Sequence, residues 1–319
     1  MAVYTHLSDT DLVALLAKYK LGALVRWRGI AEGVENSNYL LDTSSGRYIL
    51  TVYEKRTNIE ELPFFLNLME HLAGQGIPCP VPVHDAHGEV LQQIHGKAAA
   101  IVTFLEGQSV RRIQNVHCAA LGEWLAHMHI AAESFAMERV NTMGISHWRQ
   151  QANGLGEQVE RFRTGIRQEI AYTLADIEAR WPAQLPSGVI HADLFPDNVF
   201  FQGQTLSGII DYYFACTDMF VYDLAICMNA WCFEPTYEFN ITKAGYLLRA
   251  YHTVRPLSDE EMRTLPVLCT GAAMRFFLSR LHDWLHPVEG ALVTPKDPAE
   301  YLTKVRFHMQ VKTIAEYGL

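Results

Sequence analysis

Three polar residues in the middle of the chain have the types and the spacing needed to transfer a phosphoryl group. Asp193 lies two residues after His191 and five residues before Asn198. Asp211 follows the apolar run 206–210. In this spacing the first Asp accepts the proton of an attacking hydroxyl, while the Asn and the second Asp bind Mg²⁺. The pattern predicts Asp193 as the catalytic base and Asn198 and Asp211 as metal ligands.

The chemistry explains why these residue types are required. Phosphoryl transfer needs little covalent help from a protein, so its main demands are in-line positioning and neutralisation of the charge on the triphosphate. Mg²⁺ is a hard cation that prefers oxygen ligands. The apolar runs 199–201 and 206–210, separated by the turn 202–204, predict a hairpin. This hairpin would bring Asn198 and Asp211 to the same end.

A purely structural role is the alternative explanation for some of the polar residues in this part of the chain. Isolated Asp and Asn residues near turns usually cap helices or bond to loop backbone, and we assign that role to Asp197, which follows Pro196. A His that opens such a loop usually orients or packs, so we assign His191 a structural role. The complete set, with its downstream Asp and flanking apolar strands, favours function over this alternative.

The set resembles the aminoglycoside-phosphotransferase and choline-kinase group of small-molecule kinases, which share the protein-kinase fold. Ala192 stands where protein kinases carry the Arg that reads a phosphorylated activation loop. Asp211-Tyr212-Tyr213 replaces the Asp-Phe-Gly of protein kinases. We therefore expect no phosphorylation switch.

Within that group the chain looks closest to the bacterial homoserine kinases of the kinase-like type. The matching segments are GIAEGVENSNYLL (29–41), YILTVYE (48–54), LPFFLNLMEHLAGQGIPCPVP (62–82), HADLFPDNVFF (191–201), IIDYYFAC (209–216), VYDLAICMNAWC (221–232) and RFFLSRL (275–281). The resemblance implies an ATP- and Mg²⁺-dependent enzyme that converts L-homoserine to O-phospho-L-homoserine in threonine biosynthesis. The alternatives are a kinase for another hydroxyl-bearing amine, such as choline, hydroxylysine or an aminoglycoside, and a nucleotide-binding pseudokinase.

Composition agrees with a small-molecule enzyme. A chain of 319 residues, 49% of them hydrophobic, can bury a core large enough for one bilobal unit or two domains. A net charge of -9 without a dense Lys/Arg run argues against a nucleic-acid partner. The N-terminus lacks the pattern of a signal peptide and no stretch has the length of a membrane span, so we expect a cytoplasmic protein. The six cysteines have no C-x-x-C spacing, which favours buried thiols. The oligomeric state is left open.

The first part of the chain predicts an α+β unit. Ser8 and Asp11 form a capping box for an amphipathic helix, and Asn58 could cap a helix running to about Gly74. The expected strands are 24–30, 38–41, 48–53, 90–94 and 98–104. These elements predict a five-stranded antiparallel sheet with one helix, which is the nucleotide-binding N-lobe of a kinase-like fold, at residues 1–104.

The rest of the chain, residues 105–319, predicts a mainly helical C-lobe that carries catalysis and substrate binding. Apolar residues from Leu121 to Met128 recur at helical spacing and indicate a core-facing helix. His129 on this helix is assigned to the core. The segment 150–179 is rich in charge and helix formers, so we predict a solvated helical hairpin there.

The resemblance implies two sets of nucleotide contacts in the N-lobe. The backbone of the hinge after the fifth strand would bond the adenine edge, and a Gly- and Asn-containing loop would offer donors to phosphate. The hinge set is Phe104, Leu105 and Glu106, and the loop set is Gly33, Asn36 and Ser37.

Thr51 occupies the place in the third strand where a kinase normally carries a Lys or Arg for the phosphates. Thr is the usual residue in the homoserine-kinase-like subgroup, so we still predict a nucleotide contact there. The phosphate cation remains unassigned. Lys55 and Arg56 are nearby candidates.

Asp223 follows the catalytic segment in the resembled family, where an Asp at the start of a helix bonds the backbone of the catalytic loop. Helix capping is the alternative role for such a residue. Both roles are structural, so we expect Asp223 to support the catalytic residues without contacting substrate.

Substrate recognition is predicted on weaker signals. Arg275 and Arg280 lie in the apolar stretch 272–281, where a buried guanidinium needs a partner. Arg275 could bind the carboxylate of homoserine or form a salt bridge with a helix Asp or Glu. Asn229 and Trp231 are further candidates for the substrate pocket.

Overall fold

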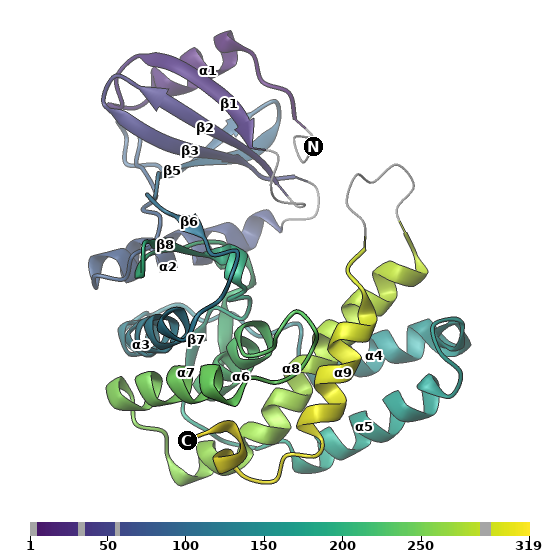
Figure 1. Cartoon of the computed structure of the whole chain (residues 1–319). Coiled ribbons are helices and arrows are strands. Elements are labelled where there is room, and N and C mark those ends of the chain that lie inside the picture. The colour runs from purple at the N-terminus through teal and green to yellow at the C-terminus, as the bar shows by residue number, and fades with distance from the viewer. Residues whose placement is uncertain (1–4, 31–35, 55–57, 288–294) are drawn as a thin grey trace. The chain divides into compact units, whose positions relative to one another are not determined.

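The computed structural model describes residues 5–30, 36–54, 58–287 and 295–319, and the chain divides into two units (Figure 1). The first unit comprises Met1–Gly107 together with Ser207–Ile210. The second unit comprises Gln108–Leu206 and Asp211–Leu319. The first unit is built on a sheet and the second mainly on helices, which is the predicted α+β composition.

The sheet of the first unit has five antiparallel strands, as the sequence predicts. They are β1 (Leu24–Ile30), β2 (Ser37–Thr43), β3 (Gly46–Val52), β4 (Leu91–Ile94) and β5 (Lys97–Thr103), in the order β1-β2-β3-β5-β4. The two-residue loop between β4 and β5 consists of His95 and Gly96, both at positive φ. That conformation matches the twist of a tight hairpin.

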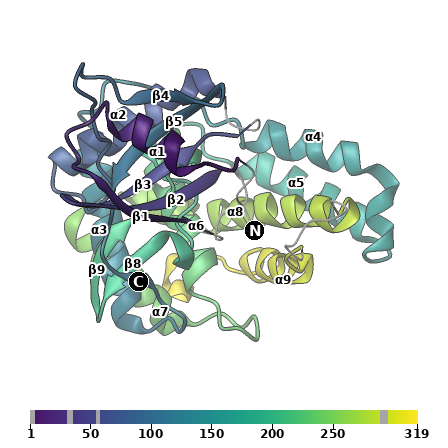
Figure 2. The ribbon, with the colours of Figure 1, turned by 90° about the horizontal axis from the view of Figure 1, so that it is seen from above.

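Helices cover this sheet. α1 (Asp9–Leu16) begins with the predicted capping box of Ser8 and Asp11, and its leucines join the core beneath β2 and β3. α2 (Leu62–Gly74) follows a short 3₁₀ turn (Ile59–Glu61) that Asn58 caps through a bond from the Glu60 amide. The helix predicted from Asn58 is therefore confirmed, but its first turn is a 3₁₀ turn and not an α-helical one. Figure 2 shows α1 lying across the sheet.

The second unit contains seven helices among its described residues. They are α3 (Asn115–Ala132), α4 (Ile145–Leu155), α5 (Ile166–Arg180), α6 (Phe220–Trp231), α7 (Ile241–Val254), α8 (Asp259–Leu285) and α9 (Pro298–His308). Gly122 of α3 lies against α7, where an added Cβ would approach the Leu247 carbonyl oxygen to 2.2 Å. Only glycine permits this close crossing, which brings His129 of α3 and Tyr251 of α7 within bonding distance.

Short strands position the catalytic segment. β7 (Ser187–Ile190) pairs antiparallel with β10 (Cys216–Met219), and β6 (Gln108–Ser109) pairs with β8 (Val199–Gln202). β8 and β9 (Thr205–Ile209) form the predicted hairpin. The residues 191–198 thus connect β7 to β8 and end in a 3₁₀ turn (Pro196–Asn198).

The segment 150–179 forms two helices, but the prediction that it is solvated is wrong on one face. Trp148, Leu155, Ile170 and Leu174 are buried, because α4 and α5 both pack beside α8 (Figure 2). Two other predictions about buried side chains agree with the structure. His129 is a buried core residue and all six cysteine side chains are buried. Within the described ranges, no helix is long and apolar enough to cross a membrane.

Candidate active site

The backbone of the segment after β7 is held by one buried carboxylate. Asp223, in the first turn of α6, accepts bonds from the amide of His191 at 2.8 Å and from the amide of Ala192 at 2.9 Å. No side chain caps α6, whose first flanking residue is Met219. The family role predicted for Asp223 is therefore confirmed, and the helix-capping alternative is wrong.

Asp223 is itself fixed by a chain of buried partners. His129 Nε2 lies 3.2 Å from the Asp223 carboxylate, and His129 Nδ1 lies 2.7 Å from the Tyr251 hydroxyl. Burial alone would raise the pKa of Asp223, but the hydrogen bonds from His129 and from the His191 amide hold that pKa below its usual range. Burial lowers the pKa of His129, which favours the neutral imidazole. An ionised Asp223 therefore bonds the loop amides directly, and a neutral His129 fixes its carboxylate.

Arg275 bonds to the same loop at the carbonyl group of Ala192. Its guanidinium donates to the Ala192 carbonyl oxygen at 2.9 Å and lies 4.8 Å from the centre of the Phe276 ring. Arg275 is only 3% exposed. Ala192 has a φ of 63°, which is strained for a residue with a side chain. Bonds to both its N–H and its C=O stabilise this conformation.

This geometry corrects the two roles predicted for Arg275. Its guanidinium donates to a backbone carbonyl, and its carbon centre lies 5.9 Å from the Phe214 ring centre and 4.8 Å from the Phe276 ring centre. Arg275 therefore acts as a support for the loop instead of as an anchor for a substrate carboxylate or as half of a helix salt bridge. Arg280 does form the predicted salt bridge, with Glu300 at 2.5 Å.

Asn229 and Trp231 lie in the core, which corrects their prediction as pocket residues. Both side chains are fully buried. Trp231 Nε1 donates to the Leu194 carbonyl oxygen at 2.8 Å. The Asn229 amide donates to the carbonyl oxygens of Ala225 and Cys269, each at 3.0 Å. Trp231 adds a third fixed point to the catalytic loop, and Asn229 joins α6 to α8.

The predicted base and the first predicted metal ligand are in contact. The Asn198 side-chain amide donates to the backbone oxygen of Asp193 at 2.8 Å and to its carboxylate at 3.3 Å. His191 Nδ1 accepts from the Asp193 amide at 3.3 Å, and its ring packs on Tyr212. His191 is fully buried, which agrees with the structural role assigned to it.

Electrostatics connect Asp193 with Asp211. Burial is the largest influence and raises the pKa of Asp193 to about 7. The positive charges of Arg275 and Lys296 oppose that rise, and the carboxylate of Asp211 adds to it. Asp211 begins a 3₁₀ turn with a φ of 67°, a second strained residue with a side chain. Asp193 is thus bonded to Asn198 and within electrostatic reach of Asp211.

A cluster of charges on α8 and α9 lies near this centre, and only Arg280 among its members was singled out from the sequence. Glu300 pairs with both Arg280 and Lys304, at 2.5 and 2.6 Å. Tyr301 is fully buried, and the charge of Asp193 raises its pKa in addition to the larger effect of burial. Lys296 is exposed and its ammonium lies 5.6 Å from the Phe195 ring centre.

In the first unit, the polar residues predicted to bind phosphate have their side chains bonded to neighbouring residues of the sheet. The Thr51 hydroxyl donates to the Asn38 side chain at 2.8 Å, and the Asn36 side chain accepts from the Glu54 amide at 3.1 Å. The Ser37 hydroxyl donates to Glu54 at 2.7 Å. Asn36, Ser37 and Thr51 are at most 6% exposed. Their side chains therefore anchor the sheet end, which corrects the expectation of side-chain donors to phosphate.

Glu54 is the centre of this cluster, and no role was predicted for it from the sequence. It forms an ion pair with Lys97, whose ammonium also lies 2.6 Å from the Thr5 hydroxyl. Burial would raise the pKa of Glu54, but bonds from Lys97, Ser37 and Thr5 lower it overall. Neither residue belongs to a recognisable motif, because the partners lie 43 positions apart. Gly33, Lys55 and Arg56 lie outside the described residues.

The predicted hinge is braced by Arg47 of β3. The Arg47 guanidinium lies 4.3 Å from the centre of the Phe104 ring and pairs with Glu106. The Glu106 carbonyl oxygen accepts from the Ser207 hydroxyl at 2.7 Å. Contacts of Phe104, Leu105 and Glu106 with adenine stay a prediction.

Residues 26–257 match the family model described as the phosphotransferase enzyme family, and the chain belongs to that family. The predicted resemblance to this group is therefore confirmed.

Curated relatives give a narrower likeness. The chain is 55% identical over 319 residues to the homoserine kinase of Brucella anthropi, covering 100% of this chain and 98% of the relative. It is 54% identical to the homoserine kinase of Xanthobacter autotrophicus, covering 100% and 99%.

Solved structures share the fold at low sequence identity. An amicoumacin kinase bound to AMP-PNP and Ca²⁺ has a TM-score of 0.70 at 16% identity, over 95% of this chain and 93% of that one. A spectinomycin phosphotransferase bound to ADP and spectinomycin has a TM-score of 0.68 at 14% identity, over 98% of both chains. The predicted α+β, protein-kinase-like fold is confirmed.

Proposed function

We propose that the protein transfers the γ-phosphoryl group of ATP to the hydroxyl of L-homoserine, producing O-phospho-L-homoserine for threonine biosynthesis. The observation that carries this proposal is the identity of 52–55% to homoserine kinases over the full length of the chain. The family model supports the reaction type, whereas the low-identity structural relatives support the fold alone. The proposed location is the cytoplasm.

Asp193 is the proposed base. Its carboxylate would accept the proton of the substrate hydroxyl as the oxygen attacks phosphorus. Burial raises its pKa to about 7, which makes it a stronger proton acceptor than an exposed Asp. The backbone bonds of Asp223 and Arg275 hold the loop, so that the carboxylate does not have to be ordered during the reaction.

Asn198 and Asp211 are the proposed Mg²⁺ ligands. The donor set fits a hard cation, because it offers one amide oxygen and one carboxylate. The Asn198 amide nitrogen is already directed at Asp193, and this orientation turns the amide oxygen outward as a possible ligand. When bound, Mg²⁺–ATP supplies the phosphoryl group and neutralises its developing charge.

Lys296 replaces Arg275 as our proposed contact for the substrate carboxylate. It is exposed, lies over Phe195 of the catalytic loop and acts electrostatically on Asp193. Replacing it by Met would keep the length of the side chain and remove its charge. We expect a higher KM for homoserine with little change in the KM for ATP. Lys312→Met, at an exposed position, provides the control.

ADP formation from Mg²⁺–ATP, measured against a panel of hydroxyl compounds, tests the proposal. The panel contains L-homoserine, L-serine, choline, hydroxylysine and an aminoglycoside. We expect the highest kcat/KM with L-homoserine and none above background in Asp193→Asn. A higher kcat/KM with another acceptor would replace homoserine as the substrate. Nucleotide binding without turnover of any acceptor would instead support the pseudokinase alternative.

A further inference from the structure

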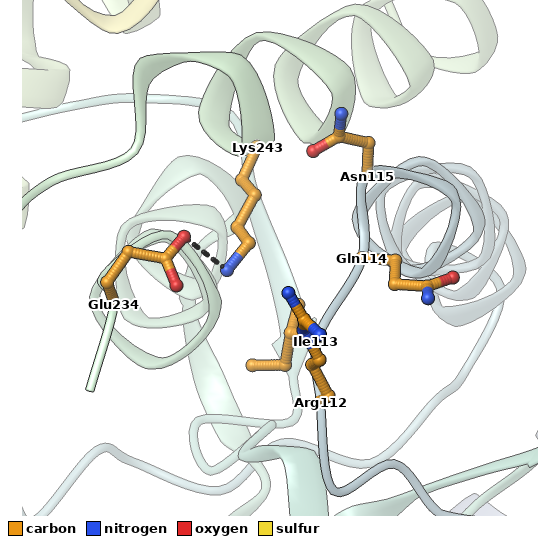
Figure 3. Close-up of a pocket in the computed structure, with 6 residues that line it drawn as sticks. All are labelled: Arg112, Ile113, Gln114, Asn115, Glu234 and Lys243. Carbon is orange, nitrogen blue, oxygen red and sulfur yellow. Dashed lines mark ion pairs between the residues drawn. The ribbon is translucent and has the colours of Figure 1, made fainter.

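A cavity of about 400 Å³ lies in the second unit where α3 and α7 begin (Figure 3). Its size is within the range of small-molecule sites. The lining residues come from the segment before α3, the start of α3, the segment before α7 and α7 itself. They are Arg112, Ile113, Gln114, Asn115, Glu234 and Lys243. None of them belongs to the catalytic loop or to the residues that support it.

The cavity lining carries two cations and one anion. The Lys243 ammonium pairs with the Glu234 carboxylate at 2.7 Å, and the Arg112 guanidinium points toward this pair (Figure 3). Bonds from Lys243 and Asn240, and the charge of Arg112, lower the pKa of Glu234. Glu234 is therefore ionised and offsets one of the two positive charges. One positive charge remains in excess.

Helix ends add to this positive potential. α3 has 18 residues and α7 has 14, and neither has an acidic residue in its first turn. The usual residue there is an Asp or Glu, which the helix dipole stabilises. Lys243 is instead the third residue of α7 and is only 7% exposed. A buried cation at this position needs a negative partner, and Glu234 supplies one.

We propose that this cavity binds a small oxyanion, either a carboxylate or a phosphate monoester. The Arg112 fork matches the geometry of two oxygens, and Lys243 supplies a compact charge at the buried side. Glu234 keeps Lys243 in place and disfavours ligands whose second group is also anionic. The site is separate from the catalytic centre, and the inference does not depend on homoserine being the substrate.

Calorimetric titrations of the full-length protein at low ionic strength test this site. The probes are inorganic phosphate, acetate and O-phospho-L-serine, which distinguish a free phosphate, a carboxylate and an amino-acid phosphate ester. Saturable binding of at least one probe is expected. The lack of saturable binding by all three overturns the proposal.

Two adjacent arginines provide a matched pair of variants. Arg111 and Arg112 are both exposed and belong to the same segment, but only Arg112 lines the cavity. Arg112→Gln should weaken binding about tenfold or more, since it removes a charge-assisted contact, whereas Arg111→Gln should leave the dissociation constant unchanged. Equal weakening by both variants would indicate diffuse surface charge and overturn the site.

A second variant and a competition experiment complete the test. Lys243→Met should also abolish binding, and a melting curve shows whether the variant remains folded. If it does not fold, the Arg112 and Arg111 pair still decides the question. Saturating AMP-PNP with Mg²⁺ should leave the affinity for the probe unchanged. Competition would assign the cavity to the nucleotide site and overturn a separate one.

Discussion

Two charged regions of the second unit use buried charge in different ways. Around the catalytic loop, Asp223 and Arg275 bond to backbone groups of His191 and Ala192. On α8 and α9, the charges of Arg280, Glu300 and Lys304 bond mainly to one another. Both regions include an Arg from α8, five residues apart. The same residue type thus orients catalytic backbone at one position and joins two helices at the other.

The difference has a consequence for mutagenesis. Loss of a backbone support changes the position of the catalytic carboxylate, so it should reduce turnover more than stability. Loss of a side-chain pair leaves an uncompensated charge between helices, so it should reduce stability more than turnover. The catalytic residues themselves should change turnover alone.

Replacement of the base should have the largest effect. Asp193→Asn keeps the shape of the side chain and removes the proton acceptor, so we expect kcat to fall by about 10²–10⁴-fold. The melting temperature and the affinity for Mg²⁺–ATP should change little. Coupled ADP detection and calorimetry measure both quantities on one preparation. Turnover close to that of the parent would remove Asp193 from this role.

Replacement of the second proposed metal ligand should separate metal binding from base catalysis. Asp211→Ala removes a carboxylate, so Mg²⁺-dependent nucleotide binding should weaken together with kcat. Asp193→Asn, in contrast, should weaken only kcat. Titration of each variant with ATP in the presence and absence of Mg²⁺ gives the comparison. Parent-like Mg²⁺–ATP binding by Asp211→Ala would contradict the metal assignment.

Asp223→Asn tests the loop support directly. The change replaces one acceptor oxygen by a donor that faces a backbone N–H, and charged hydrogen bonds of this kind contribute about 1.5–3 kcal/mol. We expect a lower free energy of unfolding and a lower kcat. Denaturant unfolding and steady-state kinetics provide the measurements. Glu123→Gln, at an exposed position of α3, is the control and should change stability by less than about 0.5 kcal/mol. Equal losses in the two variants would contradict the support role.

The segment that carries Asp193 and Asn198 and the strands of the sheet could be predicted because their signals are local. Asp193 and Asn198 lie on one loop, and alternating apolar residues mark the strands. Asp223 was predicted from the resemblance, but the supporting contacts of Arg275 and His129 could not be, because Arg275 and Ala192 lie 83 positions apart and His129 and Asp223 lie 94 apart. Only the packing of α3, α6 and α8 brings these pairs together.

For the short polar residues of the first unit, a local pattern was present but gave the wrong role for the side chains. Ser and Asn near a Gly-containing loop are typical of phosphate contacts, which led to the prediction for Asn36 and Ser37. Burial of these side chains against the Glu54–Lys97 pair is a tertiary effect without a local pattern. The sequence therefore indicated the correct segment of the fold but not how its side chains are used.

Arg275→Lys and Arg280→Lys compare the two regions on one helix. Lys keeps the charge but loses the planar fork, so each change weakens bonding without removing the cation. Arg275→Lys should lower kcat with the KM for homoserine almost unchanged, because its partner is the Ala192 carbonyl. Arg280→Lys should mainly lower the melting temperature. A raised KM without loss of kcat in Arg275→Lys would restore its predicted role as a substrate contact.

The smallest expected effect concerns pH and a histidine near the α9 cluster. His308 is buried, and burial together with the charge of Lys304 lowers its pKa to about 3. Between the unfolded value of roughly 6.5 and the folded value, the unfolded chain binds a proton that the folded protein does not. The stability contributed by this residue is therefore complete above the unfolded pKa. This contribution decreases as pH falls through that window, by at most about 1.4 kcal/mol per pH unit.

His308→Gln removes the titrating group, so the free energy of unfolding of this variant should decrease less between neutral pH and pH values of about 4 to 5. Urea unfolding of the parent, of His308→Gln and of a control at the exposed His127 of α3 measures these slopes. A slope in His308→Gln equal to that of the parent would show that His308 does not carry this dependence.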